Sequence, residues 1–248
     1  MHPLGSTRSK VRHDHAVLGL DSHVRSPLPG WSQSSAIVLI SPRMGAQFGQ
    51  LLVEMGAGAR AGLPKSGVER FIWIVEGSAS LELDGHLHEL GPGSYALIPP
   101  NHGHQLVSTG GARVMLVEKP YVPLDGVEDP VPIVGREDEV APVALLGDED
   151  LHVRVLIPET PEHDLAMNTM TFAPGAALPF VEVHSMEHGL LMLSGTMVYR
   201  LGEEWHLLQA GDVVYMAPYC PQWATAYGKT PAKYLLYKDW NRDPLMQP

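Results

Sequence analysis

An internal repeat limits the fold of this chain more than any other feature of its sequence. Residues 71–100 (FIWIVEGSASLELDGHLHELGPGSYALIPP) align without a gap with residues 189–218 (GLLMLSGTMVYRLGEEWHLLQAGDVVYMAP), at an offset of 118 residues. Two glycines and a proline stand at matching places in both segments: Gly77 and Gly195, Gly93 and Gly211, Pro100 and Pro218. Because self-similarity at a fixed offset marks a repeated structural unit, the 248-residue chain is predicted to contain the same domain twice.

Each copy has the pattern of β-strands. In Ser78–Leu83 (SASLEL) and Thr196–Leu201 (TMVYRL) apolar and polar residues alternate, as they do in a strand with one buried face. Asp84-Gly85 is a hairpin-turn signal, and Gly202 stands at the matching place in the second copy. The 25 glycines and 22 prolines are spread as single turn residues, which is typical of many short strands joined by tight turns.

Evenly spaced strands indicate a small barrel or sandwich, in which the sheet leaves few free edges. The sequence therefore predicts an all-β protein with two tandem barrels and at most a short turn of helix in residues 125–139. The expected parts of the chain are an N-terminal extension (1–35), a first barrel (36–120), a linker rich in proline, glycine and acidic residues (121–142) and a second barrel (143–248).

Charge and composition exclude several classes of protein. The formal net charge of −11 argues against binding to nucleic acid, which requires basic patches. The longest apolar stretches, such as 71–75 and 189–193, are too short to span a bilayer, and residues 1–24 lack the apolar core of a signal peptide. The single cysteine, Cys220, fits a reducing compartment. We therefore expect a cytoplasmic protein that contacts neither nucleic acid nor membrane.

A possible metal-binding motif occurs only in the second copy. Residues 180–188 (FVEVHSMEH) place Glu182, His184 and His188 in the pattern E-x-H-x-x-x-H, and in an extended strand these positions share one face. Gln222 follows the next apolar strand and could add a fourth group. A carboxylate, two imidazoles and an amide suit a divalent ion such as Mn²⁺, Fe²⁺, Ni²⁺ or Zn²⁺ rather than a thiol-seeking metal. A chance grouping on the surface is the alternative, since the chain has 13 histidines.

The first copy lacks this motif. At the same offset it has Pro64, Ser66 and Arg70, and only His104, opposite Gln222, is a histidine. Because one histidine does not hold a catalytic ion, the first barrel is expected to be structural. His102 and His104 are not interpreted as a metal pair, and His13 and His15, like His86 and His88, are interpreted as exposed alternating positions without a metal.

The motif and its setting resemble the cupin superfamily, whose usual pattern is His-x-His, then Glu, then His. Here Glu182 stands for the first His, His188 for the Glu and Gln222 for the last His. This permutation in a two-cupin chain resembles the (S)-ureidoglycine aminohydrolase family. The similarity covers most of the chain and includes ISPRMGAQF, KPYVPLDG, EVHSMEHG and YKDWNRD. It implies two tandem cupin (double-stranded β-helix, or jelly-roll) barrels.

The resemblance also implies an enzyme of allantoin (purine) breakdown that uses Mn²⁺ and converts (S)-ureidoglycine to ureidoglycolate and ammonia. It assigns the metal to Glu182, His184, His188 and Gln222, substrate contacts to Tyr199, Tyr234 and Lys238, and catalytic roles to Glu182, Tyr234 and Lys238. The residues themselves agree with an anionic substrate, since a lysine directed into a barrel requires an anion such as a carboxylate. By family analogy, a homo-oligomer is expected.

Two other functions fit the same sequence. Two-cupin proteins include metal-dependent dioxygenases and isomerases that act on small carboxylates, and a different metal or consumption of oxygen would identify one. A protein that binds a small ligand without turnover is the other possibility. Cys220 is interpreted as a small buried residue without a redox role.

Overall fold

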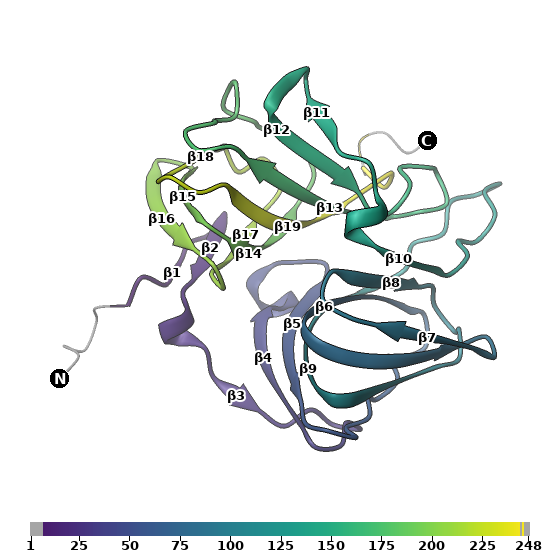
Figure 1. Ribbon diagram of the computed structural model, residues 1–248. Helices are drawn as coiled ribbons and strands as arrows, with labels where there is room; N and C mark the ends of the chain where they lie inside the picture. The colour runs from purple at the N-terminus through teal and green to yellow at the C-terminus, as the bar shows by residue number, and fades with distance from the viewer. Residues whose placement is uncertain (1–6, 244, 246–248) are drawn as a thin grey trace. The chain divides into compact units, whose positions relative to one another are not determined.

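The computed structural model describes residues 7–243 and residue 245. The chain divides into two compact units (Figure 1). The first-repeat unit comprises residues 24–140 and 160–164, and the second-repeat unit comprises the described residues before 24, residues 141–159 and the described residues from 165 onward. The predicted all-β class is confirmed. The helical segments of the described residues are three short 3₁₀ turns, η1 (Leu20–Ser22), η2 (Pro42–Met44) and η3 (Glu137–Glu139).

The first-repeat unit is built around two long strands that bend and pair along most of their lengths. β6 (Val68–Leu83) pairs with β9 (His104–Pro120) in antiparallel register, with irregularities near Ile74 and Ser78 that bend the sheet. The sheet has the order β10-β8-β6-β9-β5-β4-β3, and β7 pairs with β6. Its other strands are β3 (Arg25–Ser26), β4 (Ser34–Ile40), β5 (Gly49–Met55), β7 (His86–Leu90), β8 (Ser94–Ile98) and β10 (Ile133–Arg136).

The second-repeat unit has the same plan in two sheets. One has the order β1-β2-β17-β14-β19-β13-β12-β11, and the other is the three-stranded sheet β16-β15-β18. The strands are β1 (Lys10–Val11), β2 (His15–Leu18), β11 (Val143–Leu145), β12 (Asp148–Val155), β13 (Leu165–Phe172), β14 (His188–Ser194), β15 (Thr196–Leu201), β16 (Glu204–Gln209), β17 (Val213–Met216), β18 (Gln222–Ala226) and β19 (Ala232–Asp239). In Figure 1 they curve around a common interior, which a cluster of apolar side chains fills.

The alternation expected from the sequence is present in both copies. Ala79, Leu81 and Leu83 are buried along β6, and Met197, Tyr199 and Leu201 are buried along β15, while the residues that alternate with them are more exposed. The expected hairpins also form. Asp84 and Gly85, both with positive φ, connect Leu83 to its register partner His86, and the tight turn at Gly202 and Glu203 connects the paired residues Leu201 and Glu204.

The repeat-matched glycines Gly77 and Gly195 have a steric explanation. Their φ angles are +74° and +72°, in the left-handed region that favours glycine. A Cβ at Gly77 would collide with the carbonyl oxygen of Gly111 and lie 3.0 Å from the Cα of Ala112. A Cβ at Gly195 would collide with the carbonyl oxygen of Pro231 and lie 2.6 Å from the Cα of Ala232. Both glycines therefore mark a bend where two backbones approach too closely for any side chain.

The N-terminal segment contributes strands to the second-repeat unit, although it precedes the first copy in the sequence. β2 pairs with β17 in antiparallel register, with His15 opposite Met216 and Leu18 opposite Val213. Ala16 and Val17 are each 1% exposed. The edge of the second-repeat sheet is thus covered by a part of the chain that the repeat alignment does not contain.

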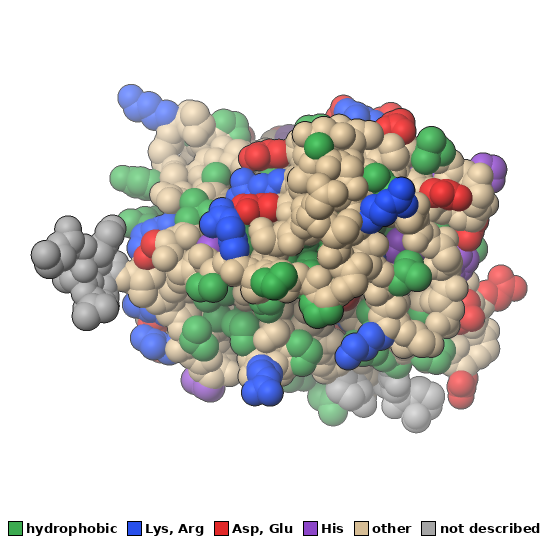
Figure 2. Space-filling model, turned by 90° about the horizontal axis from the view of Figure 1, so that it is seen from below, with side chains coloured by type: hydrophobic (Ala, Val, Ile, Leu, Met, Phe, Trp, Pro, Cys, Tyr) green, Lys and Arg blue, Asp and Glu red, His purple; other side chains and the backbone are tan. Residues whose placement is uncertain are grey.

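The surface has charges of both signs. On the face drawn in Figure 2, basic and acidic side chains are interspersed among apolar and other groups, and the described residues there form no continuous basic area. Among the described residues, no helix has the length and apolar character needed to cross a membrane.

Candidate functional site

The backbone brings the motif segment next to Gln222. Glu182 and Gln222 form an isolated antiparallel bridge, in which each amide N–H donates to the other residue's carbonyl oxygen, at N···O distances of 2.8 and 2.9 Å. The carbonyl oxygen of His184 accepts a hydrogen bond of 2.7 Å from the N–H of Tyr219. These contacts hold together two segments of the second-repeat unit that are about 40 residues apart in the sequence.

The side chains of three of the expected ligands converge. The Nε2 atoms of His184 and His188 lie 3.1 Å apart, and Nε2 of Gln222 lies 2.9 Å from Nε2 of His184. The two imidazole rings meet edge to face, with centroids 4.7 Å apart. A half-turn of the Gln222 amide exchanges its nitrogen and oxygen, so the group can present Oε1 to the histidines. This arrangement directs three donor atoms to one point.

Glu182 shares the cavity but stands further from the two histidines. Two groups of His, Cys, Asp and Glu among the described residues have all their ligand atoms within 4.8 Å of one another, and Glu182 belongs to neither. Burial is the main influence on its carboxyl group and raises its pKa, while the charge of Lys238 lowers it. Glu182 would therefore have to rotate toward the histidines to complete a four-ligand site.

Burial keeps both histidines in the neutral form that binds metals. It lowers the pKa of His188 well below its ordinary value, with smaller contributions in the same direction from His184 and Lys238. The pKa of His184 is lowered by burial and then by Lys238. Their lone pairs are available at neutral pH, because protons do not compete for them.

A cavity of about 430 Å³ opens at this cluster, within the size range of small-molecule sites. Lys238 on β19 lies in register between His188 of β14 and Ala166 of β13, which places its amine beside the histidines. Burial lowers the pKa of Lys238, and the charges of Glu159 and Glu182 raise it. All seven residues expected from the sequence line this cavity: Glu182, His184, His188, Tyr199, Gln222, Tyr234 and Lys238.

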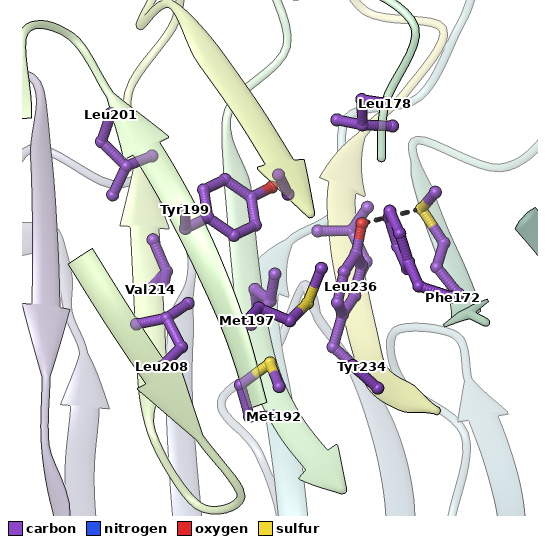
Figure 3. Packing of buried hydrophobic residues seen from close by; sticks show 14 of the residues in the cluster. Phe172, Leu178, Met192, Met197, Tyr199, Leu201, Leu208, Val214, Tyr234 and Leu236 are labelled. Atoms are coloured by element: carbon purple, nitrogen blue, oxygen red, sulfur yellow. Dashed lines mark hydrogen bonds between the residues drawn. The ribbon is translucent and has the colours of Figure 1, made fainter. Parts of the chain in front are cut away.

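The two tyrosines belong both to the core and to the cavity wall. Figure 3 shows Tyr199 and Tyr234 among the buried side chains of the second-repeat unit, and each is 2% exposed. The Tyr199 hydroxyl donates to Oε1 of Gln222 at 3.3 Å, and the Tyr234 hydroxyl donates to the sulfur of Met170 at 3.0 Å. Burial is the largest cause of the raised pKa of both phenols. They are therefore hydrogen-bonding groups rather than bases at neutral pH.

Comparison with known proteins identifies the family. The Cupin domain family matches residues 51–118 and 168–237, one segment in each unit. A probable (S)-ureidoglycine aminohydrolase of Oryza sativa subsp. japonica is 42% identical over 98% of this chain and 78% of its own length. The (S)-ureidoglycine aminohydrolase of Arabidopsis thaliana is 42% identical over 97% of this chain and 80% of its own. The chain belongs to the (S)-ureidoglycine aminohydrolase family of cupins.

A solved cupin structure shows the same architecture. The putative glyoxylate-induced protein of Pseudomonas aeruginosa superposes with a TM-score of 0.89 at 32% identity, over 97% of this chain and 94% of that one. The resemblance inferred from the sequence motifs is confirmed by these comparisons.

The first cupin unit has a cation of its own at the place that corresponds to His188. Arg70 is 2% exposed, and its guanidinium donates to Oε1 of Glu118 at 2.6 and 2.8 Å. It also lies 3.1 Å from Nε2 of His104, the residue opposite Gln222 in the repeat. A fixed positive charge therefore occupies the position where the second cupin has its histidine pair.

The cavity is also lined by residues that the sequence did not point to, among them Asn168, Glu159 and Met186. Asn168 is 2% exposed, and within the described part of the chain its Oδ1 atom has no hydrogen-bond partner. It lies in the apolar strand β13, where an asparagine between Met167 and Thr169 was the available signal. Glu187, the residue before His188, does not line the cavity and accepts a hydrogen bond of 3.5 Å from Tyr215.

Proposed function

We propose that the chain hydrolyses (S)-ureidoglycine to ureidoglycolate and ammonia, with Mn²⁺ as the metal. One observation carries this proposal: the seven residues that match functional positions of the family line a single cavity of the second cupin. The relatives at 42% identity are named for this activity. In the reaction, the C–N bond to the amino group breaks and a C–O bond to water forms at the same carbon.

The donor set fits the proposed ion. Glu182, His184, His188 and Gln222 supply one carboxylate, two neutral imidazoles and one amide, a combination of hard and borderline ligands that suits Mn²⁺. When bound, the ion supplies positive charge that polarises the reacting groups and fixes the orientation of the substrate. Other divalent transition metals satisfy the same donors, so the choice of Mn²⁺ rests on the family.

Lys238 binds the substrate carboxylate in this proposal. Its amine lies next to the histidine pair, and its charge is opposed only in part by Glu159 and Glu182. A carboxylate between Lys238 and the metal ligands would replace the water that a half-buried ammonium group otherwise needs. The carbon that carries the amino group is then held within reach of Glu182.

Asn168 and the two tyrosines recognise the ureido group. The buried Oδ1 of Asn168 is an acceptor for a ureido N–H. The hydroxyl groups of Tyr199 and Tyr234, which donate to Gln222 and Met170 in the free protein, turn to donate to the ureido carbonyl oxygen. Because a buried acceptor without a partner costs about 1–3 kcal/mol, an N–H that reaches Asn168 recovers that free energy on binding. A substrate without the ureido group would lose this contribution.

Glu182 is proposed to transfer the proton. Its carboxylate lines the cavity together with the histidines and Lys238, where it can accept a proton from water and return it to the leaving group. It takes a proton from the attacking water and gives one to the departing amine, so the overall proton balance is zero. Tyr234 assists as a hydrogen-bond donor to the substrate.

The test is ammonia release from freshly generated (S)-ureidoglycine by the Mn²⁺-loaded protein. We expect release above the spontaneous rate, abolished by chelation and by His184→Ala. An isotope-labelled water experiment should place one solvent oxygen in ureidoglycolate. Absence of any acceleration by protein with Mn²⁺ verified at one ion per chain would refute the proposed reaction.

A further inference from the structure

A second cluster of metal-binding side chains lies in the same unit, outside the cavity. His15 is on the N-terminal strand β2, and Glu204 and His206 are two residues apart on β16 and so share one face of that strand. One ligand atom from each of these three residues lies within 4.8 Å of the other two. The cavity lining includes none of them.

The two histidines are buried, and each has an atom that the fold does not satisfy. His15 is 3% exposed and His206 is 6% exposed, so the interpretation of His15 as an exposed residue is wrong. β2 covers the edge strand β17 and is thereby buried. The Nε2 atoms of both rings are buried without a hydrogen-bond partner among the described residues. Leaving such atoms unpaired is costly, so a ligand that binds them is the physical explanation.

The hydrogen bond of His15 prepares it for a metal. Its Nδ1 lies 2.9 Å from Oδ1 of Asp14, a contact in which the ring N–H donates to the carboxylate. That bond fixes the tautomer with the lone pair on Nε2, which is the arrangement that carboxylate–histidine pairs give to metal ligands. The His15 and His206 rings meet edge to face with centroids 5.4 Å apart. Nε2 of His206 lies 3.7 Å from Oε2 of Glu204.

We propose that His15, Glu204 and His206 form a second metal site, selective for Zn²⁺ and structural in role. Two imidazoles and one carboxylate, with water as a fourth ligand, match a common tetrahedral Zn²⁺ donor set. The ion would connect β2 of the large sheet to β16 of the three-stranded sheet. It would thereby hold the N-terminal strand against the second cupin and join its two sheets.

Protonation does not prevent this binding. Burial, followed by the charge of His15, lowers the pKa of His206 to about 4, so its imidazole is neutral at pH 7. Glu204 also interacts with two basic residues: Lys10 approaches Oε2 at 3.3 Å, and Arg12 donates to Oε1 at 2.8 Å. The carboxylate can keep Arg12 on Oε1 while Oε2 turns to the ion. Lys10 is the competing cation, and its half-exposed side chain is free to move into solvent.

A neighbouring group shares His15 but is less suited to a metal. Asp14, His15 and Cys220 also have ligand atoms within 4.8 Å of one another. Asp14 accepts a hydrogen bond from Nδ1 of His15, on the other side of the ring from the Nε2 atom that would bind the ion. We therefore assign the ion to Nε2 of His15 together with Glu204 and His206, and not to the group that contains Cys220.

The test removes the cavity histidines first, so that only the second site is measured. The full chain with His184→Ala and His188→Ala is dialysed against Zn²⁺ and analysed by elemental analysis and calorimetry. We expect one Zn²⁺ per chain and a metal-dependent rise in melting temperature. Adding Glu204→Gln or His206→Ala should remove both. Adding His13→Ala, an exposed histidine two residues from His15, or Cys220→Ser should remove neither. Circular dichroism establishes that each variant is folded, and Glu204→Gln keeps the size of a partly exposed side chain.

The competing cation gives an independent readout. Adding Lys10→Gln should tighten Zn²⁺ binding by about two- to five-fold, as expected for loss of one partly exposed charge. A background variant that binds no Zn²⁺ would overturn the proposal. Loss of the ion in Cys220→Ser but not in Glu204→Gln would also overturn it, since the metal would then belong to the other group. Neither result bears on the proposed reaction, because no residue of this site lines the cavity.

Discussion

Replacement of Lys238 by methionine tests the proposed substrate site most directly. The amine of Lys238 is half-buried at the cavity wall, in register with His188, and it is the residue proposed to bind the substrate carboxylate. Methionine retains most of the apolar stem and removes the charge. The change should weaken binding of the anionic substrate without emptying the metal site.

The magnitude follows from the position of the charge. Two unit charges 4 Å apart attract by about 4 kcal/mol at an effective dielectric constant of about 20, the value that suits partly buried sites. Desolvation of the carboxylate and of the half-buried amine cancels part of this attraction, which leaves about 2–3 kcal/mol for a hydrogen bond between charged groups. Since each 1.36 kcal/mol is a factor of ten, kcat/KM for (S)-ureidoglycine should fall roughly 30- to 160-fold.

The metal should respond in the opposite direction. Lys238 lowers the pKa of both His184 and His188, which shows that its positive charge acts on the same point as the ion would. Its removal should leave Mn²⁺ affinity unchanged or increase it. Burial, the larger cause of both shifts, keeps the histidines neutral in the variant.

The assay measures initial rates of ammonia release over a range of substrate concentrations, together with Mn²⁺ content. Lys233→Met is the matched control, because Lys233 is on the same strand and does not line the cavity. A Lys238→Met enzyme with full metal content and kcat/KM within about three-fold of the parent (~0.6 kcal/mol) would refute the reasoning. So would an equal loss in Lys233→Met, since the effect would then not arise from the cavity.

Three further predictions address the metal, the pH dependence and the fold. His184→Ala should lower Mn²⁺ affinity by more than the roughly 10- to 100-fold that loss of an outer-shell partner costs. Dialysis followed by elemental analysis measures the bound Mn²⁺. His152 lies outside the cavity, so His152→Ala should bind Mn²⁺ as the parent does. Burial lowers the pKa of Lys238 below 10.5, and its charged form is lost as pH rises through that lowered pKa, so KM should rise at alkaline pH. Lys238→Arg should move this rise in KM to higher pH. Identical pH profiles for the two enzymes would contradict the assignment of Lys238 to the substrate carboxylate. Gly77→Ala should reduce the free energy of unfolding, measured by urea denaturation, by at least about 2 kcal/mol, because its φ is left-handed and the added Cβ collides with the Gly111 carbonyl. Gly110→Ala, with nothing within 4 Å of its Cβ position, should change the urea midpoint little.

The first cupin has a buried arginine at the position where the second cupin has His188. Arg70 brings a permanent positive charge, and Glu118 and His104 surround it with acceptors. In the second cupin the corresponding histidine is neutral and shares its place with a second imidazole and an amide. A buried guanidinium group at this position repels a divalent ion, which supports the expectation that the first cupin is structural.

The sequence by itself predicted the repeat, the alternating strands and the motif residues Glu182, His184, His188 and Gln222, which line one cavity in the structure. The repeat is visible in the sequence because its offset is fixed. The strands and the motif are visible because side chains alternate along a strand, which places residues two apart, such as Glu182 and His184, on one face. The family resemblance added Tyr199, Tyr234 and Lys238 to the same site, and all three line the cavity in the structure.

Only the tertiary structure decided what lies next to these residues. Asn168 enters the cavity because β13 pairs with β19, and His15 is buried because β2 pairs with β17. His15 meets His206 because strands from two different sheets face each other, so a metal site can form from residues that are 191 positions apart. Such pairings depend on which apolar faces cover one another once the barrel closes, and no local period in the sequence records that choice.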